Sequence, residues 1–382
     1  MKDAAKWMGN KSRRAMSFNR MGKRLFGLIW PDQRHGQTAM KRVRGPMSHV
    51  IVLDGTMSSL KPGCETNAGL TFRLLSETGG PVSVFYEAGV QWNDWRSTHH
   101  VLMGRGVNRQ IKRAYGYLAS RYRDGDKIFF FGYSRGAYAV RSLAGVIDAV
   151  GLLRPEHATE RNVEQAYRLY QLGAGNAQKT AFQAQFCHEK AEVEMVGVWD
   201  TVKALGLRLP LLWRWSESNH AFHNHQLGSA IRHGFQALAL HETRSVFEPV
   251  LWECPQNWQG RVEQVWFPGT HGDIGGQLDG DAEARLLSNI PLVWMLERAE
   301  SCGLPLPQGW RARFPRDPAA KSVGTWKSWG KLFLLRGRRR VGAGACESLH
   351  ESVDARAMAA GWAPSLPRIK ASKFGAKAFV AR

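Results

Sequence analysis

Three polar residues of this 382-residue chain have the types that acyl transfer from an ester requires, and each follows an apolar run. Ser134 stands in GYSRG after a run of three phenylalanines, Asp200 ends MVGVWD, and His271 follows VWFPGT. A serine hydroxyl attacks an ester only when an imidazole takes its proton, and a carboxylate must hold that imidazole in the right tautomer. We therefore expect Ser134 to act as nucleophile, His271 as general base and Asp200 as the orienting acid.

The residues around Ser134 predict a sharp turn from a strand into a helix. Residues 128–131 form a β-branched and aromatic run that suits a buried parallel strand, and residues 140–150 repeat apolar side chains at helical spacing. In a nucleophile elbow the strand and the helix nearly touch, so glycine is needed on both sides of the serine, here at Gly132 and Gly136. The alternative is an ordinary serine in a tight turn.

The tetrahedral intermediate of acyl transfer carries an oxyanion, which needs two N–H donors. One comes from the residue after the nucleophile, here Arg135, and the other comes from a loop that follows an early strand. The LDGT stretch provides that loop, so Gly55 or Thr56 is the expected second donor.

Other acidic residues near the predicted strand ends leave alternatives open. Asp200 could cap a helix that starts at Thr201. Asp273 could replace Asp200 as the acid or hold the turn before Gly275, and Asp54 could line the site or cap the first turn.

His271 competes with twelve other histidines, among them a cluster at positions 220, 223 and 225. This H-x-x-H-x-H spacing could ligate a metal ion. However, the cluster follows a Trp-rich stretch and has no cysteine or carboxylate pair nearby, so we expect a surface loop. We predict neither a metal nor a cofactor.

Strand-like and helix-like segments alternate along the middle of the chain. Strands are expected at 49–56, 82–89, 128–131, 193–200 and 262–269, and helices at 66–77, at 108–122 and after the elbow serine. The last two strands are separated by about 60 residues of mainly helix and loop, including an insertion over the sheet at 205–225. The pattern predicts an α/β fold, with a mostly parallel sheet, helices on both faces, and ligands at the carboxyl ends of the strands. The order serine, aspartate, histidine is that of an α/β-hydrolase.

The net charge of +21 is concentrated at the two ends of the chain. Residues 1–44 hold 12 Lys and Arg against 2 Asp and Glu, residues 311–382 hold 16 against 4, and the middle is nearly neutral. We therefore divide the chain into a basic N-terminal segment (1–44), an α/β-hydrolase core (45–310) and a basic C-terminal segment (311–382) that packs on the core or extends it. Basic ends favour anionic partners. The basic and apolar stretch 20–31 suits a membrane surface as well as a solvated tail, and the Gly-rich stretch 334–344 suits a flexible loop.

Targeting signals and cysteines give further expectations. No apolar stretch approaches the length of a membrane-spanning helix, and the polar N-terminus shows no secretory signal peptide, which predicts synthesis in the cytoplasm. Five scattered cysteines without C-x-x-C spacing suggest neither a disulfide framework nor a zinc site, so we expect them to be reduced.

Seven motifs resemble, in order, the α/β-hydrolase family that includes the Tle-type antibacterial phospholipase effectors of type VI secretion. They are VLDGT, FYEAGV, FFFGYSRGAYAVRSLAG, GVWDTV, ALALHETRSVFEPVLW, VWFPGTHGDIGGQ and LSNIPLVWMLERAESCGL. The resemblance spans about residues 48–305, and LHESVDARA followed by WAPSLP resembles the terminal segment of that family. It implies a triad without metal or cofactor, carried by Ser134 in GYSRGA, Asp200 in GVWDTV and His271 in FPGTHGDIGG.

The chain departs from the family pattern in two places. His241 stands in ALALHETR where relatives commonly have an acidic residue, and Gly272 follows the triad histidine where they often have serine. Both departures concern hydrogen bonding around the triad.

The resemblance implies a serine esterase or lipase that hydrolyses acyl esters of phospholipids and acts as an antibacterial type VI secretion effector. It implies three partners, namely a phospholipid membrane surface, a secretion-apparatus component and an immunity protein, with delivery into target cells. Two alternatives stay open: a soluble carboxylesterase, and a non-catalytic protein that binds membrane or nucleic acid through its basic ends. We expect no nucleic acid, because aromatic residues do not interleave regularly with the basic ones.

Overall fold

The computed structural model describes residues 44–89, 105–173, 177–202, 227–254, 258, 260–326 and 333–360. The chain divides into two units between residues 45 and 46, and nearly all described residues belong to the second. The stretch 20–31 and the insertion expected at 205–225, with its histidine cluster, lie outside the described residues. Within these ranges, no helix combines the length and apolarity needed to cross a membrane.

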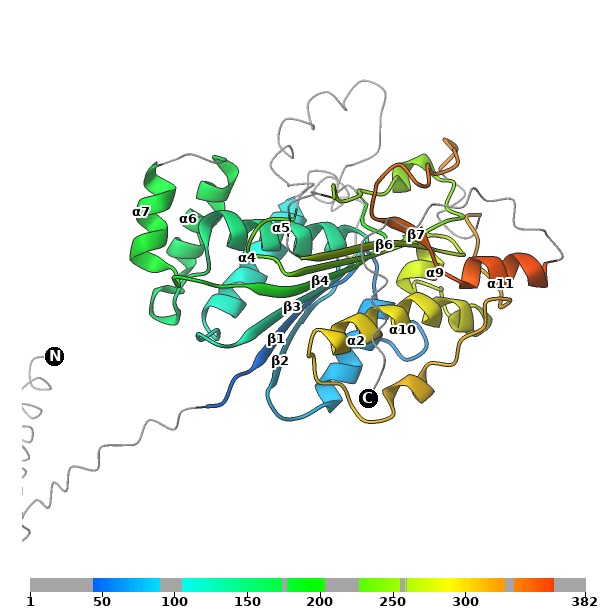
Figure 1. Cartoon of the computed structure of the whole chain (residues 1–382), viewed down its shortest axis with the longest axis horizontal. Coiled ribbons are helices and arrows are strands. Elements are labelled where there is room, and N and C mark those ends of the chain that lie inside the picture. Colours follow the sequence, from blue (N-terminus) through cyan, green and yellow to red (C-terminus); the bar gives the residue numbers. More distant parts are fainter. Residues whose placement is uncertain are drawn as a thin grey trace, which may run out of the picture. The chain divides into compact units, whose positions relative to one another are not determined.

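A parallel sheet forms the centre of the second unit (Figure 1). Among the described residues it has seven strands in the order β2-β1-β3-β4-β5-β6-β7, and every neighbouring pair is parallel. The strands are β1 (Ser48–Leu53), β2 (Val82–Glu87), β3 (Lys127–Tyr133), β4 (Val193–Trp199), β5 (His233–Ala239), β6 (Arg261–Phe267) and β7 (Glu347–Leu349). Since all strands run the same way, their carboxyl ends meet at one edge of the sheet.

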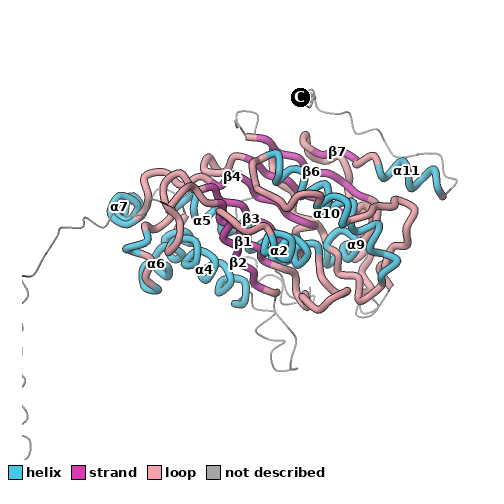
Figure 2. The backbone as a smooth tube through the Cα atoms, turned by 90° about the horizontal axis from the view of Figure 1, so that it is seen from below, coloured by secondary structure: helices cyan, strands magenta, loops and turns pink. Residues whose placement is uncertain are grey.

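Helices cover both faces of the sheet (Figures 1 and 2). The α-helices are α2 (Asn67–Glu77), α4 (Arg105–Ala119), α5 (Arg135–Val150), α6 (Glu160–Gln171), α7 (Ala177–Phe186), α9 (His271–Gly275), α10 (Arg285–Ser301) and α11 (Ser352–Ala359). Short 3-10 turns lie at Pro155–His157, Ser245–Phe247, Ala282–Ala284 and Trp310–Arg313. α5 packs on β1, β3 and β4 with α4 and α6 beside it, whereas α2 and α10 lie on the opposite face. The predicted α/β-hydrolase fold class is therefore confirmed.

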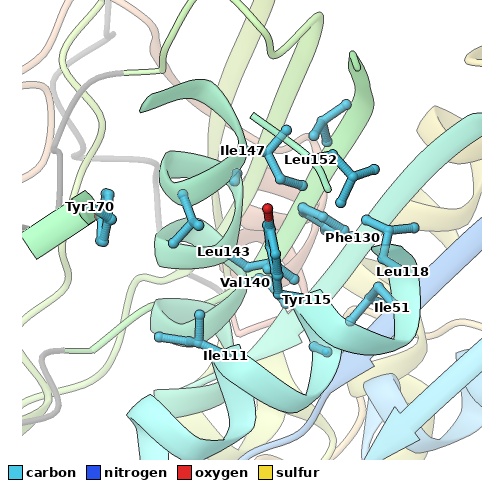
Figure 3. Close-up of a cluster of buried hydrophobic side chains, with 14 of the residues drawn as sticks. Ile51, Ile111, Tyr115, Leu118, Phe130, Val140, Leu143, Ile147, Leu152 and Tyr170 are labelled. Atoms are coloured by element: carbon cyan, nitrogen blue, oxygen red, sulfur yellow. The ribbon is translucent and has the colours of Figure 1, made fainter. Parts of the chain in front are cut away.

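The strand side chains alternate between two apolar cores, one under each layer of helices. In β1, Ile51 and Leu53 face the core beneath α4 and α5, while the alternate residues face the core beneath α2 and α10. Figure 3 shows the first core, where the Tyr115 ring lies among apolar side chains. The Tyr115 hydroxyl donates to the Gly151 carbonyl oxygen at 2.8 Å, so this buried polar atom is satisfied. Burial of both faces explains why the strands read as continuous apolar runs.

Two strands of the sheet were missed in the sequence. β5 lies in the interval where we expected mainly helix and loop. Its centre holds Gln236, whose buried side chain donates to the Val250 carbonyl oxygen at 3.1 Å. β7 has only three residues and begins at the buried Glu347, which accepts a hydrogen bond from the Trp266 indole at 2.7 Å. Polar side chains satisfied inside the sheet break the apolar runs by which strands are recognised.

A disulfide joins Cys254 and Cys346, whose Cα atoms lie 6.1 Å apart. The expectation that all five cysteines are reduced was therefore wrong for this pair. The two residues are 92 positions apart, so their spacing gave no indication that they meet. The bond fastens the residue before β7 to the loop between β5 and β6. Cys64, Cys187 and Cys302 are free thiols.

Candidate active site

The three residues selected from the sequence lie together at the carboxyl edge of the sheet. Ser134 joins β3 to α5, Asp200 follows β4, and His271 begins α9 after β6. His271 Nε2 lies 2.9 Å from Ser134 Oγ, and its Nδ1 lies 2.6 Å from Asp200 Oδ2. The three residues are buried, with exposed fractions of 7%, 0% and 5% for serine, aspartate and histidine. In this geometry the imidazole can accept the serine proton while its other nitrogen donates to the carboxylate.

The main chain is strained at two of these positions. Ser134 has a φ of 56° and a ψ of −119°, and Asp200 has a φ of 43°, which are rare values for residues other than glycine. Such conformations cost about 1–3 kcal/mol each and persist only where the surrounding structure enforces them. At Ser134 the strained turn leaves the hydroxyl within hydrogen-bonding distance of His271.

Gly132 and Gly136 occupy places in the elbow where the main chain leaves no room for a side chain. A Cβ atom on Gly136 would lie 2.1 Å from the Leu53 carbonyl oxygen, and one on Gly132 would lie 2.6 Å from the Ala137 Cα. In both cases the obstacle is backbone, which cannot move aside as a flexible side chain can. The close approach of β1, β3 and α5 thus explains both glycines.

We expect Gly136→Ala to lower the free energy of unfolding by about 3 kcal/mol, because the new methyl group must push α5 away from β1. Denaturant unfolding of the parent and the variant measures the loss. Gly116→Ala in α4 is the matched control, since a Cβ there would make an ordinary 3.6 Å contact with Val163. The control should keep or gain stability. A loss below about 1 kcal/mol for Gly136→Ala would contradict the packing argument.

The three oxyanion candidates lie beside the serine but differ in whether their N–H group is free. Arg135 is the first residue of α5, where an N–H group has no partner within the helix. The Gly55 N–H donates to Asp54 Oδ1 at 2.7 Å, whereas no described residue accepts from the Thr56 N–H. The loop packs against the serine, since a Cβ on Gly55 would lie 3.4 Å from Ser134 Cβ. Of the two loop residues, Thr56 is therefore the one whose N–H group is available to bind an oxyanion together with that of Arg135.

Asp54 fixes the loop that carries these donors. Its carboxylate accepts hydrogen bonds from the Gly55 N–H, from the Thr66 hydroxyl at 2.6 Å and from the Tyr86 hydroxyl at 2.8 Å. Burial raises the pKa of Asp54 to about 6, although these hydrogen bonds oppose the rise. The side chain thus supports the loop and titrates within an accessible pH range.

We expect the contribution of Asp54 to stability to depend on pH. Its pKa is about 6 in the folded protein and about 4 in an unfolded chain. The folded state therefore binds more protons in this window, and stability falls as pH rises through it. Relative to Asp54→Asn, the parent should lose up to about 3 kcal/mol of unfolding free energy between pH 4 and pH 7. Urea unfolding of both proteins measures this difference, and a difference independent of pH would contradict the raised pKa.

Asp273 is the other carboxylate considered for the triad, and it binds the turn at the start of α9. Its Oδ2 accepts from the Thr270 N–H at 2.7 Å, and its Oδ1 accepts from the Val323 N–H at 2.9 Å. The carboxylate that reaches the imidazole is that of Asp200. Within the described ranges, no cluster of three or more His, Cys, Asp or Glu side chains is arranged to hold a metal ion.

A buried glutamate that we did not select from the sequence holds the main chain of His271. Glu242 Oε2 accepts from the His271 N–H at 3.1 Å and pairs with Arg244 at 2.7 Å. Burial would raise the pKa of Glu242, but the hydrogen bonds and charge of Arg244 hold it below its usual value. The preceding His241 accepts from the Gly269 N–H at 2.9 Å through Nδ1. An acidic side chain is therefore present one residue after the first departure from the family pattern.

Gly272, the second departure, lies where a side chain would not fit. A Cβ atom there would be 2.8 Å from the Gln277 carbonyl oxygen and 3.1 Å from the Val323 side chain. A serine at this position would require the loop after α9 to shift. Local packing thus accounts for the glycine.

Two aromatic rings enclose the imidazole of His271. Phe247 stacks on it with ring centroids 4.7 Å apart and planes 14° apart, and the Tyr133 ring lies 4.9 Å away. The Tyr133 hydroxyl donates to the His271 carbonyl oxygen at 3.2 Å. These contacts fix the plane of the imidazole and keep water from most of its surface.

Asp200 has a second partner, Arg339, in the stretch that we expected to be a flexible loop. Arg339 Nη1 lies 2.6 Å from Asp200 Oδ1, and Nη2 lies 2.9 Å from Oδ2. Burial would raise the pKa of Asp200, but the charge of Arg339 and hydrogen bonds from Arg339 and His271 hold it well below its usual range. Asp200 is therefore ionised at neutral pH. The sequence could not single out Arg339, because it stands in the run RGRRR.

Comparisons with individual proteins find relatives that share part of their length with this chain. The uncharacterised protein YEL023C of Saccharomyces cerevisiae is 26% identical over 217 residues, which cover 48% of this chain and 31% of that protein. A crystal structure of an uncharacterised protein from Pseudomonas aeruginosa gives a TM-score of 0.41 at 15% identity, covering 84% of this chain and 54% of that one. The structure of the Tle1 effector bound to the VgrG spike from the type 6 secretion system gives 0.26 at 17%, covering 61% and 51%. This chain spans about a third of the curated relative and about half of the two solved chains.

A family model matches the part of the chain that forms the site. Residues 48–298 match the model described as the catalytic domain of the Tle1-like phospholipase effectors of the type VI secretion system. The matched range includes Ser134, Asp200 and His271 and ends before Arg339. Since the match covers well over half of the 382 residues, the chain belongs to the family of Tle1-like phospholipase effectors of the type VI secretion system.

Proposed function

We propose that the protein hydrolyses acyl esters of phospholipids through a covalent acyl-enzyme on Ser134. The observation that carries this proposal is the hydrogen-bonded chain from Ser134 Oγ through His271 to Asp200, with distances of 2.9 and 2.6 Å. Membership of a phospholipase effector family supports phospholipids as the substrate class.

In the first step, Ser134 Oγ attacks the ester carbonyl carbon while its proton moves to His271 Nε2. The carbonyl oxygen takes the negative charge and accepts hydrogen bonds from the N–H groups of Arg135 and Thr56. The ester C–O bond then breaks, and His271 gives the proton to the oxygen of the departing alcohol. A water molecule, deprotonated by the same imidazole, releases the fatty acid and restores Ser134. Asp200 stays ionised throughout and stabilises the imidazolium.

A phospholipid membrane is the surface on which we expect the protein to meet its substrate. Leu334 and Leu335 are 80% and 70% exposed, and Trp326 is 59% exposed. Arg338 and Arg340 are also exposed in the same part of the chain. Exposed leucine and tryptophan next to arginine suit the boundary between lipid tails and anionic headgroups.

Fatty-acid release from mixed phospholipid vesicles by the purified protein tests this proposal. In parallel, labelling with a fluorophosphonate followed by peptide mass analysis shows which serine forms the covalent adduct. We expect fatty acid as the product and the label on Ser134. Release of the headgroup without fatty acid, or a label on a different serine, would contradict the mechanism.

The alternatives predict different results in related assays. A lipase should gain activity when a short-chain phospholipid passes from monomers to micelles, whereas a soluble carboxylesterase should not. A non-catalytic binding protein would hydrolyse neither form. Deletion of residues 1–44 should leave a hydrolase able to cleave soluble esters but should remove the function of a protein that acts through its basic end.

Family membership also supports delivery by a type VI secretion system and contact with a component of that apparatus. An immunity protein is a further expected partner, because a phospholipase would damage the membranes of the cell that makes it. Expression in a bacterial host tests the need for such protection. The parent should be toxic and Ser134→Ala harmless. Equal growth of the two strains would argue against the need for an immunity protein.

A further inference from the structure

Arg339 binds Asp200 with both terminal nitrogens of its guanidinium group. Nη1 donates to Oδ1 at 2.6 Å and Nη2 to Oδ2 at 2.9 Å, a fork that fixes the carboxylate in one plane. Nη1 also donates to the Ala239 carbonyl oxygen at 2.9 Å, and Nη2 donates to that of Phe247. The guanidinium therefore ties the carboxylate to the end of β5 and to the loop that follows it.

The Asp200 carboxylate is fully engaged by these contacts. Oδ2 is shared between Arg339 Nη2 and His271 Nδ1, and Oδ1 accepts from Arg339 Nη1 and from the Ala239 N–H at 3.0 Å. The side chains of Asp200 and Arg339 are 0% and 4% exposed, so water cannot replace a lost donor without entering the core. Rotation of the carboxylate would break bonds at both oxygens.

The segment that carries Arg339 is fastened to the core on both sides of this residue. The Gly337 N–H donates to the Thr243 carbonyl oxygen at 2.7 Å, and the Cys254–Cys346 disulfide holds the chain further along. The family match ends at residue 298, so this arginine comes from a part of the chain that the match does not include.

We propose that Arg339 is a positioning residue for the hydrolysis proposed above. It holds the Asp200 carboxylate in the plane that His271 requires, and the imidazole in turn keeps Nε2 within reach of Ser134 Oγ.

Substitutions of Arg339 by lysine and glutamine separate the effect of the fork from that of the charge. Arg339→Lys keeps the charge without the fork, so kcat should fall about tenfold while KM stays near that of the parent. Arg339→Gln removes both, so kcat should fall about 100-fold, again with little change in KM. Arg168→Ala in α6, an exposed arginine outside this segment, should match the parent in kcat and in KM.

A second readout does not depend on turnover. NMR of the proton on His271 Nδ1 reports its hydrogen bond to Asp200 in the parent and in both Arg339 variants. This resonance should shift upfield and broaden in Arg339→Gln, because the carboxylate is then free to rotate, and it should change less in Arg339→Lys. A parent that cleaves no ester would reject the proposed function, and this resonance would still decide the role of Arg339.

Three results would overturn the proposal. One is a folded Arg339→Gln with the kcat and the Nδ1 proton resonance of the parent and only a lower melting temperature, which would leave Arg339 as an anchor of its segment. The second is Arg339→Lys with the kcat of the parent, which decides the matter if the glutamine variant does not fold. The third is an equal change in Arg168→Ala, which would indicate an effect of surface charge.

Discussion

Ser134→Ala should reduce the rate of phospholipid hydrolysis by about 10⁴- to 10⁶-fold, because alanine has no oxygen on which the acyl-enzyme can form. The rate that remains would come from substrate binding and from the N–H donors of Arg135 and Thr56. Fatty-acid release from the same vesicles by both proteins measures the loss. The free energy of unfolding should change by less than about 1 kcal/mol, since alanine removes one oxygen and leaves the packing in place.

Ser142→Ala is the matched control for this substitution. Ser142 is also buried and lies in α5, where its hydroxyl donates to the Tyr138 carbonyl oxygen at 2.9 Å. Its removal should leave the rate within a few fold of the parent. Activity that survives in Ser134→Ala and is lost in Ser142→Ala would refute the assignment of the nucleophile.

Asp200→Asn should lower kcat by about 10⁴-fold, because an amide neither stabilises the imidazolium nor holds the imidazole in the tautomer that leaves Nε2 free to accept a proton. The loss of charge also leaves Arg339 buried without its carboxylate, which should cost about 3–5 kcal/mol of stability. The measurement is therefore kcat at a temperature where circular dichroism shows the variant to be folded.

The double variant Asp200→Asn with Arg339→Met separates these two effects. Methionine removes the unpaired cation, so stability should recover toward that of the parent while kcat stays low. A double variant with the kcat of the parent would show that Asp200 acts only through folding.

The sharp turn from strand to helix at Ser134 could be predicted from the sequence because all of its signals are local. The apolar strand, the glycines around Ser134 and the helical spacing after it are contiguous in the chain. The prediction of Asp200 and His271 needed one further rule, namely that parallel strands end at the same edge of a sheet. The structure brings all three side chains together at that edge.

The remaining features depend on contacts that only folding creates. Arg339 is 139 residues from Asp200 and differs from the neighbouring arginines only in being buried against it. Likewise, Gly55 and Thr56 are equivalent as donors in the sequence. The hydrogen bond from the Gly55 N–H to the Asp54 carboxylate distinguishes them, because it occupies the N–H group of Gly55. Periodic patterns in the sequence do not show which side chain of a basic run is buried. They also do not show which way a carboxylate points.

The late position of Arg339 and β7 in the chain has a consequence for biosynthesis. A ribosome completes β1 to β6, with Ser134, Asp200 and His271, before it reaches residue 339. Until then the nascent protein has a buried carboxylate without its cation, and β6 is an open edge of the sheet. Messages cut short before this point would yield products prone to aggregation and proteolysis. The contact between Arg339 and Asp200 therefore forms only after the segment from 333 to 349 has been translated.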